Sequence, residues 1–173
     1  MRNRLVTLVL LVAMLTGCHG YQVGTEGLYN REIKTVFVPM VQADSYRKAL
    51  GERLTEAVCK KITTRTPYDL TGPDRADSVL VIRLVSDGQY VSALNKYNDT
   101  RQKTLNWCVL VRWQDSRGYV LGETAPIPLA TEVVTTGAEA WLVPEMGQSG
   151  ATTQQEIIEK LADQIVGLME EKW

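Results

Sequence analysis

Residues 33–66 carry a hydrophobic pattern that predicts a strand followed by an amphipathic helix. Ile33 to Pro39 (IKTVFVP) is rich in β-branched and aromatic residues and ends at a proline, which is typical of a strand. From Tyr46 to Thr66, apolar residues recur every four positions and would line one face of a helix. These positions are Leu50, Leu54, Val58 and Ile62. Asp44 and Ser45 precede the pattern and are candidate N-caps.

A long β-hairpin is predicted next, followed by a third strand. Residues 78–91 are almost continuously apolar through Val85, and residues 101–114 alternate between apolar and polar side chains. The polar stretch 92–100 between them is expected to be a mobile tip. A turn then leads to a third antiparallel strand from Tyr119 to about Thr124. Beyond two prolines, we expect a further extended piece at residues 129–135 and a loop at residues 136–150.

A second amphipathic helix is predicted to close the chain. It begins near Thr152 or Thr153, which with Glu156 resembles a capping box, and it continues to the C-terminus. Its apolar positions are Ile157, Ile158, Leu161, Ile165, Leu168 and Met169. The order β-α-β-β-β-α predicts an α+β two-layer sandwich, in which two helices pack on one mostly antiparallel four-stranded sheet. Residues 33–173 are expected to form this single domain.

The predicted sheet has apolar side chains on both faces. One face would carry Leu80, Ile82, Leu84 and Val109. The other would carry Val79, Val81, Val85, Cys108 and Leu110. Two helices cover only one face. Either a partner covers the second face, or its apolar atoms are simply tolerated in water.

The N-terminus has the pattern of an export signal. Two arginines precede the apolar run Leu5 to Leu15, which is too short to cross a bilayer as a helix. Leu15, Thr16, Gly17 and Cys18 resemble the bacterial lipobox, because a thiol that can carry a thioether-linked lipid directly follows small residues. Residues 1–17 are therefore expected to be a lipoprotein signal peptide, and Cys18 to carry diacylglycerol and an N-acyl chain. An ordinary signal that happens to end in cysteine is the alternative.

The residues after Cys18 suggest a tether and a membrane location. Residues 18–32 contain three glycines and little apolar periodicity, which suits a lipidated tether. His19 follows the cysteine where, by resemblance to the sorting rule of Gram-negative lipoproteins, an aspartate would favour the inner membrane. We therefore expect a membrane-anchored protein at the periplasmic face of the outer membrane.

Composition and charge argue against nucleic-acid binding and against catalysis. The formal net charge of −1 provides no strongly basic surface for nucleic acid. The single histidine, His19, lies in the tether, where no rigid scaffold holds it as a catalytic base or a metal ligand. Asp74 and Asp77 could be paired carboxylates, but Asp77 fits better as a turn residue before a strand. We expect no enzyme, no metal site and no cofactor other than the lipid on Cys18.

Two further features leave alternatives open. Cys59 and Cys108 could form a disulfide in an oxidising compartment, or they could be buried free cysteines in a helix and a strand. Lys96, Arg101 and Lys103 lie in or near the hairpin tip, close to two tyrosines. Lysine and arginine pair well with phosphate, so these three residues are candidate contacts for a lipid phosphate. The alternative is an ordinary solvated hairpin tip.

Several short motifs together resemble the LptE family of outer-membrane lipoproteins. They are the lipobox with Cys18-His19-Gly20-Tyr21, the IKTVFVP strand, Thr66-Pro67-Tyr68 at the end of the first helix, the run Arg75 to Leu80, and the closing helix from Leu161 to Trp173. The resemblance implies a domain inside the lumen of a β-barrel partner, LptD, that helps the barrel to assemble and to deliver lipopolysaccharide to the cell surface. Periplasmic lipoproteins that regulate a cell-wall synthase or build a secretion pore are the alternative, because they also begin with a V-x-V-P strand and an amphipathic helix.

Overall fold

The computed structural model describes residues 28–44, 47–121 and 134–170. In chain order the elements are β1 (Thr35–Phe37), β2 (Gln42–Ala43), α2 (Lys48–Arg65), β3 (Asp69–Leu70), the short 3-10 turn η1 (Pro73–Arg75), β4 (Ser78–Leu94), β5 (Thr100–Asp115), β6 (Val134–Leu142), the 3-10 turn η2 (Pro144–Met146) and α3 (Gly150–Gly167). The predicted signal peptide, the predicted lipobox and Cys18 lie outside the described residues.

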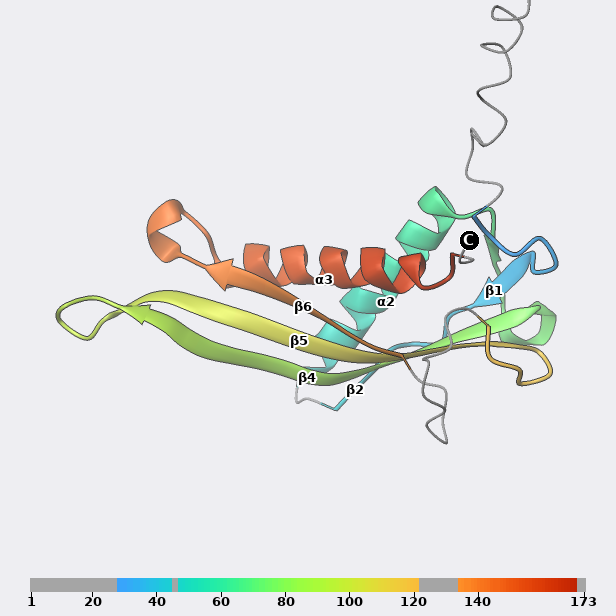
Figure 1. The fold of residues 1–173 in the computed structure, drawn as a ribbon, viewed down its shortest axis with the longest axis horizontal. Coiled ribbons are helices and arrows are strands. Elements are labelled where there is room, and N and C mark those ends of the chain that lie inside the picture. The colour runs from blue at the N-terminus through green and yellow to red at the C-terminus, as the bar shows by residue number, and fades with distance from the viewer. Residues whose placement is uncertain (1–27, 45–46, 122–133, 171–173) are drawn as a thin grey trace, which may run out of the picture.

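The structure is an α+β sandwich of two helices on one mixed sheet, which confirms the predicted fold class (Figure 1). The sheet order is β3-β1-β4-β5-β6, and β2 also pairs with β4. The long strands β4, β5 and β6 are antiparallel, whereas β1, β2 and β3 pair in parallel. The sheet has six strands rather than four, because two strands of only two residues, β2 and β3, join its edge.

The third long antiparallel strand lies later in the chain than predicted. Around Tyr119, only Val120 forms an isolated bridge, with Gln114, and residues 122–133 lie outside the described part of the chain. The third long strand, which pairs with the other side of β5 from β4, is β6; it begins at the end of the expected extended piece and lies mostly in the range where we expected a loop. β6 places Ala138 and Ala140 toward the core, and such small side chains give a weak hydrophobic alternation.

The core lies between the helices and one face of the sheet. Leu80, Ile82, Leu84 and Val109 are at most 1% exposed, as predicted for the helix-covered face. The apolar stripes of α2 and α3 pack onto them and are buried. On the opposite face, Val81 and Val85 are 37% and 46% exposed. No helix of the described residues covers this second face, which we call the open face.

Both helices begin differently from the prediction. The N-cap position of α2 is Arg47, not Asp44, because Asp44 accepts two hydrogen bonds from the Arg83 guanidinium at 2.9 and 3.0 Å. The other candidate, residue 45, lies outside the described residues. α3 is capped by Ser149, whose side chain forms a capping box with Thr152. The predicted capping box with Glu156 is therefore wrong, and α3 ends at Gly167 rather than at the C-terminus.

Helix α2 is fixed against β2 by a close backbone approach. A Cβ atom at Gly51 would collide with the carbonyl oxygen of Val41. The Thr55 hydroxyl accepts a hydrogen bond from the Val41 backbone N–H at 2.9 Å and donates one to the Gly51 carbonyl at 2.7 Å. A glycine at this position lets the helix lie directly on the chain before β2.

The two edges of the sheet differ in whether other parts of the chain contact them. At the β6 edge, Lys160 of α3 donates a hydrogen bond to the Glu139 carbonyl, and Thr136 donates one to Gln164. At the β4 edge, β1 and β2 pair only as far as Leu84. Among the described residues, no strand pairs with the outer side of β4 from residue 86 to residue 94.

Candidate functional site

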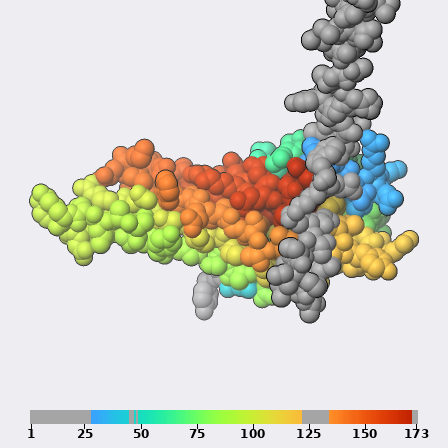
Figure 2. Space-filling model, in the orientation of Figure 1, coloured from blue at the N-terminus to red at the C-terminus, as the bar shows by residue number. Residues whose placement is uncertain are grey.

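The candidate site is the projecting end of the β4–β5 hairpin. In Figures 1 and 2 the hairpin extends past the N-terminal end of α3, at the opposite end of the molecule from β1. Its tip is a compact turn, in which the Asn95 side chain accepts hydrogen bonds from the backbone N–H groups of Tyr97 and Asp99. We call residues 90–104, together with Trp141 and η2, the hairpin end.

The three predicted cations all lie in the hairpin end, but they do not form one cluster. The Lys96 ammonium lies 4.9 Å from the centre of the Tyr97 ring at the tip. Arg101 forms an ion pair with Glu145 of η2. Lys103 is half-buried and lies between Val91 and Leu142 in the strand register. A phosphate at Arg101 would therefore compete with a carboxylate already present.

Exposed apolar side chains gather at the same end. Eleven large hydrophobic residues are exposed in the described part of the chain, and six of them lie in the hairpin end. These six are Tyr90, Val91, Leu94, Tyr97, Trp141 and Met146. The sequence drew attention to Tyr90 and Tyr97 but not to Trp141, because residue 141 was expected in a loop. Only the pairing of β5 with β6 places Trp141 beside the hairpin.

The two faces of the hairpin end differ in chemistry. Thr104 pairs with Tyr90 on one side and with Trp141 on the other, and this row lies on the open face. Lys103 and Leu142 form the next row, which points to the helix side. Lys103 therefore lies on the opposite face of the ribbon from Tyr90 and Trp141, whereas Lys96 lies with Tyr97 at the tip.

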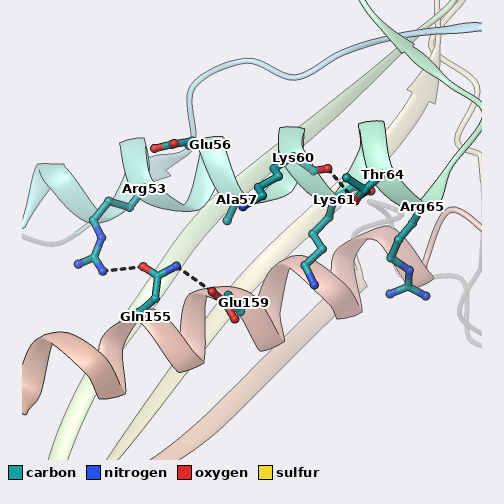
Figure 3. Close-up of a pocket in the computed structure, with 9 residues that line it drawn as sticks. All are labelled: Arg53, Glu56, Ala57, Lys60, Lys61, Thr64, Arg65, Gln155 and Glu159. Carbon is teal, nitrogen blue, oxygen red and sulfur yellow. Dashed lines mark hydrogen bonds between the residues drawn. The ribbon is translucent and has the colours of Figure 1, made fainter. Parts of the chain in front are cut away.

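Apart from the hairpin end, a hollow lies between the two helices (Figure 3). Arg53 donates a hydrogen bond to Gln155 at 2.9 Å, and Gln155 donates one to Glu159 at 3.1 Å. Lys61 and Arg65 both pair with Asp163 of α3, and hydrogen bonding from Lys61 is the main cause that holds the pKa of Asp163 below its ordinary value. These cations join α2 to α3, so we interpret the hollow as part of the helix contact.

Asp77 is a structural residue at the start of β4. Its carboxylate accepts hydrogen bonds from the backbone N–H groups of Lys34 and Thr35 at 3.1 and 3.0 Å. Hydrogen bonding from the Thr35 side chain, and then from these N–H groups, lowers the pKa of Asp77. The group therefore ties the chain at β1 to β4, which supports the turn interpretation over a pair of catalytic carboxylates.

The two described cysteines are free. Cys59 lies on α2, where burial raises the pKa of its thiol. Cys108 lies on β5 in the row of Gly137, on the open face and therefore across the sheet from the helices. The disulfide that the sequence left open is not formed, because the sheet separates the two thiols.

Within residues 28–44, 47–121 and 134–170, no three His, Cys, Asp or Glu side chains lie close enough to hold a metal ion. None of the helices in these ranges has both the length and the apolar composition that a membrane span requires.

Solved structures with a similar fold come from several bacteria. An uncharacterised lipoprotein B from Nitrosomonas europaea matches with a TM-score of 0.54 and 11% identity, over 86% of this chain and 88% of its own. A protein from Xanthomonas campestris matches with a TM-score of 0.53 and 9% identity, over 82% of this chain and 86% of its own. A hypothetical protein from Chlamydia trachomatis matches with a TM-score of 0.51 and 12% identity, over 78% of this chain and 94% of its own. At such low identity these likenesses concern the fold alone.

The family assignment comes from the sequence itself. Among curated proteins, none matches this chain. The model of one family, described as LptE and lipopolysaccharide assembly, matches residues 33–168 of the 173 residues. This range begins at the predicted first strand and runs through α3, so it contains every element of the sandwich. The chain therefore belongs to the LptE family of lipopolysaccharide-assembly lipoproteins.

Proposed function

We propose that this protein is an outer-membrane lipoprotein that supports the assembly of a β-barrel lipopolysaccharide translocon and the delivery of lipopolysaccharide to the cell surface. The observation that carries the proposal is the family match over residues 33–168. The family is described by lipopolysaccharide assembly and not by a catalytic activity. The structure adds a two-layer domain with a projecting hairpin, which suits a binding and assembly role better than catalysis.

The anchor in this proposal is Cys18. Residues 1–17 would be removed, and diacylglycerol and an N-acyl chain on Cys18 would hold the protein at the periplasmic face of the outer membrane. One acyl chain binds a membrane only marginally, whereas several chains give stable anchoring. The tether of residues 18–32 would then lead to the domain. Tyr29 limits its free length, because Tyr29 is only 3% exposed and forms a bridge with Glu170.

The partner would be a β-barrel that resembles LptD, contacted through the open face. This face includes Val81 and Val85, which are exposed, and Cys108 and Leu110, which are half-buried. Exposed apolar side chains grouped in this way favour a protein partner, and Arg83 and Arg112 in the same rows add cationic groups to the face. Burial against the barrel would remove it from water.

Lipopolysaccharide would be contacted through Lys96, Arg101 and Lys103. Lys96 is the best placed of the three, because it lies at the projecting tip with its ammonium against a tyrosine ring. Arg101 would have to exchange Glu145 for a lipid phosphate. Arginine can form two parallel hydrogen bonds with a phosphate as it can with a carboxylate, so the exchange would keep the same geometry at the guanidinium.

The test is co-purification of the full-length lipoprotein from detergent-solubilised outer membranes. The wild type should bring down a large β-barrel in comparable amount. Replacing Val81 and Val85 together by Lys should remove the barrel, because these side chains lie on the open face. Lys60→Glu on α2 is the matched control, since it changes charge at the helix side. Recovery of a peptidoglycan synthase in place of a barrel would instead support the alternative class of periplasmic lipoproteins.

A further inference from the structure

A pair of aromatic side chains flanks a threonine on the open face of the hairpin end. Tyr90 of β4 and Trp141 of β6 both pair with Thr104 of β5, one from each side. The three residues therefore form one row across three strands. Because neighbouring strands lie nearly 5 Å apart, the backbones of Tyr90 and Trp141 are separated by about 9–10 Å.

The exposure of these residues shows how the row is built. Tyr90 and Trp141 are 53% and 63% exposed. Thr104 is only 3% exposed, although no helix of the described residues covers this face. Neighbouring side chains on the open face must therefore shield Thr104, and the two aromatic side chains are its direct cross-strand neighbours. The row is a shallow platform with aromatic side chains at both ends and a hydroxyl-bearing residue between them.

Polar side chains border this platform. In the next row, the Asn106 side-chain amide donates a hydrogen bond to the Glu139 carboxylate, and Gly88 leaves the third position open. In the row toward the tip, Gln102 lies on the same face. Amide and carboxylate groups offer both donors and acceptors for hydrogen bonds. The cations of the hairpin lie elsewhere, with Lys103 on the helix side and Lys96 at the tip.

This combination fits a sugar better than it fits a phosphate or an acyl chain. A pyranose ring has an apolar face of C–H groups, which can lie on an aromatic ring, and a rim of hydroxyls, which can bond to amides and carboxylates. The Glu139 carboxylate beside the platform repels a phosphate. An acyl chain over Asn106, Gln102 and Glu139 would remove water from the donors and acceptors that the Asn106–Glu139 hydrogen bond leaves unused, which is unfavourable.

We propose that the exposed rings of Tyr90 and Trp141, which flank the buried Thr104, bind a saccharide, with Asn106, Glu139 and Gln102 as hydrogen-bonding groups. This inference rests on the proposed function, in which the natural ligand is a glycolipid. The ribbon would then hold two chemically different parts of one molecule. Its cationic residues would take the phosphates, and its open face would take the sugar chain.

The test uses the full chain and two separate probes. The first probe is the core oligosaccharide of lipopolysaccharide, freed of acyl chains and phosphate, and the second is lipid A. Titration calorimetry gives the affinity, and the indole N–H signals in NMR spectra report contact with Trp141. Trp141→Ala should weaken oligosaccharide binding about tenfold or more. Trp141→Phe, which keeps an aromatic ring, should remain within about threefold of the wild type.

Two sets of control variants separate the platform from the rest of the surface. Tyr119→Ala removes an exposed tyrosine outside the hairpin end, at 70% exposure, and should leave oligosaccharide binding unchanged. Changing Lys96, Arg101 and Lys103 to Gln should weaken lipid A binding and spare the oligosaccharide. The saccharide proposal is overturned if the wild type does not bind the oligosaccharide, or if Trp141→Ala binds it as well as the wild type. In both cases, binding of lipid A that depends on the three cations would leave the proposed function standing.

Discussion

The two halves of β4 belong to one continuous strand but have opposite relations to the core. From Ser78 to Leu84, every second residue is buried, because the helices cover that side of the strand. From residue 85 to residue 94 no residue of β4 is buried, although the ladder to β5 continues to Leu94. A register shift between Leu84 and Ser86 marks the boundary. The first half therefore contributes to stability, and the second half presents side chains to a ligand or partner.

Two leucines on β4 test this division of the strand. Leu80 is fully buried and Leu94 is 52% exposed. Leu80→Ala should lower the free energy of unfolding by about 2–5 kcal/mol, because it leaves a cavity in the core. Leu94→Ala should change it by less than about 0.5 kcal/mol. Urea denaturation measures both values, and equal losses would show that the division of β4 is wrong.

A second substitution tests whether the stability of the helix-covered half of β4, Ser78 to Leu84, depends on the close packing of α2 against Val41. Gly51→Ala should destabilise the protein by about 1–3 kcal/mol, because the added methyl group would collide with the Val41 carbonyl and push the helix away. Gly167→Ala is the matched control in α3, where nothing lies within 4 Å of the added atom. It should be neutral or stabilising by up to about 1 kcal/mol. Thermal unfolding of both variants provides the measurement. An unchanged stability of Gly51→Ala would contradict the close approach of α2 to the Val41 carbonyl.

The smallest effect concerns the acid sensitivity of the covered half. The pKa of Asp77 is lowered in the folded protein by hydrogen bonds from Thr35 and Lys34, so the ionised group stabilises the fold. This contribution is present above the ordinary pKa of 3.8 and is lost as the pH falls through the lower folded value. Asp77→Asn should therefore be less stable than wild type at neutral pH and lose less stability on acidification. Parallel denaturation curves at all pH values would contradict this role.

The sequence predicted the parts of the fold that depend on strong hydrophobic periodicity. Leu50, Leu54, Val58 and Ile62 recur at helical spacing, and all four are at most 4% exposed in α2. The alternation in residues 101–114 likewise identified β5 and its buried face. Such patterns arise because one face of each element must leave water, so the sequence carries them directly.

The elements that depend on their surroundings were predicted poorly. β6 contains Ala138 and Ala140, whose small side chains suit the space beneath α3, and together with Thr136 and Gly137 they resemble a loop in sequence. Asp44 has the chemistry of an N-cap, but it pairs with Arg83, which lies thirty-nine residues away in the chain. For the same reason the aromatic platform could not be predicted, because it exists only through the register of three strands.

The unpaired outer edge of β4 has a consequence for how the protein must be handled. Residues 86–94 contain one charged residue, Asp87, and neither proline nor lysine, so the register shifts near Ser86 and Ala93 are the main features that oppose pairing with another strand. The β6 edge, in contrast, is covered by hydrogen bonds from α3. When the purified domain is concentrated without its partner, molecules should associate edge to edge through β4. A lysine at Gln89 should keep such samples monomeric.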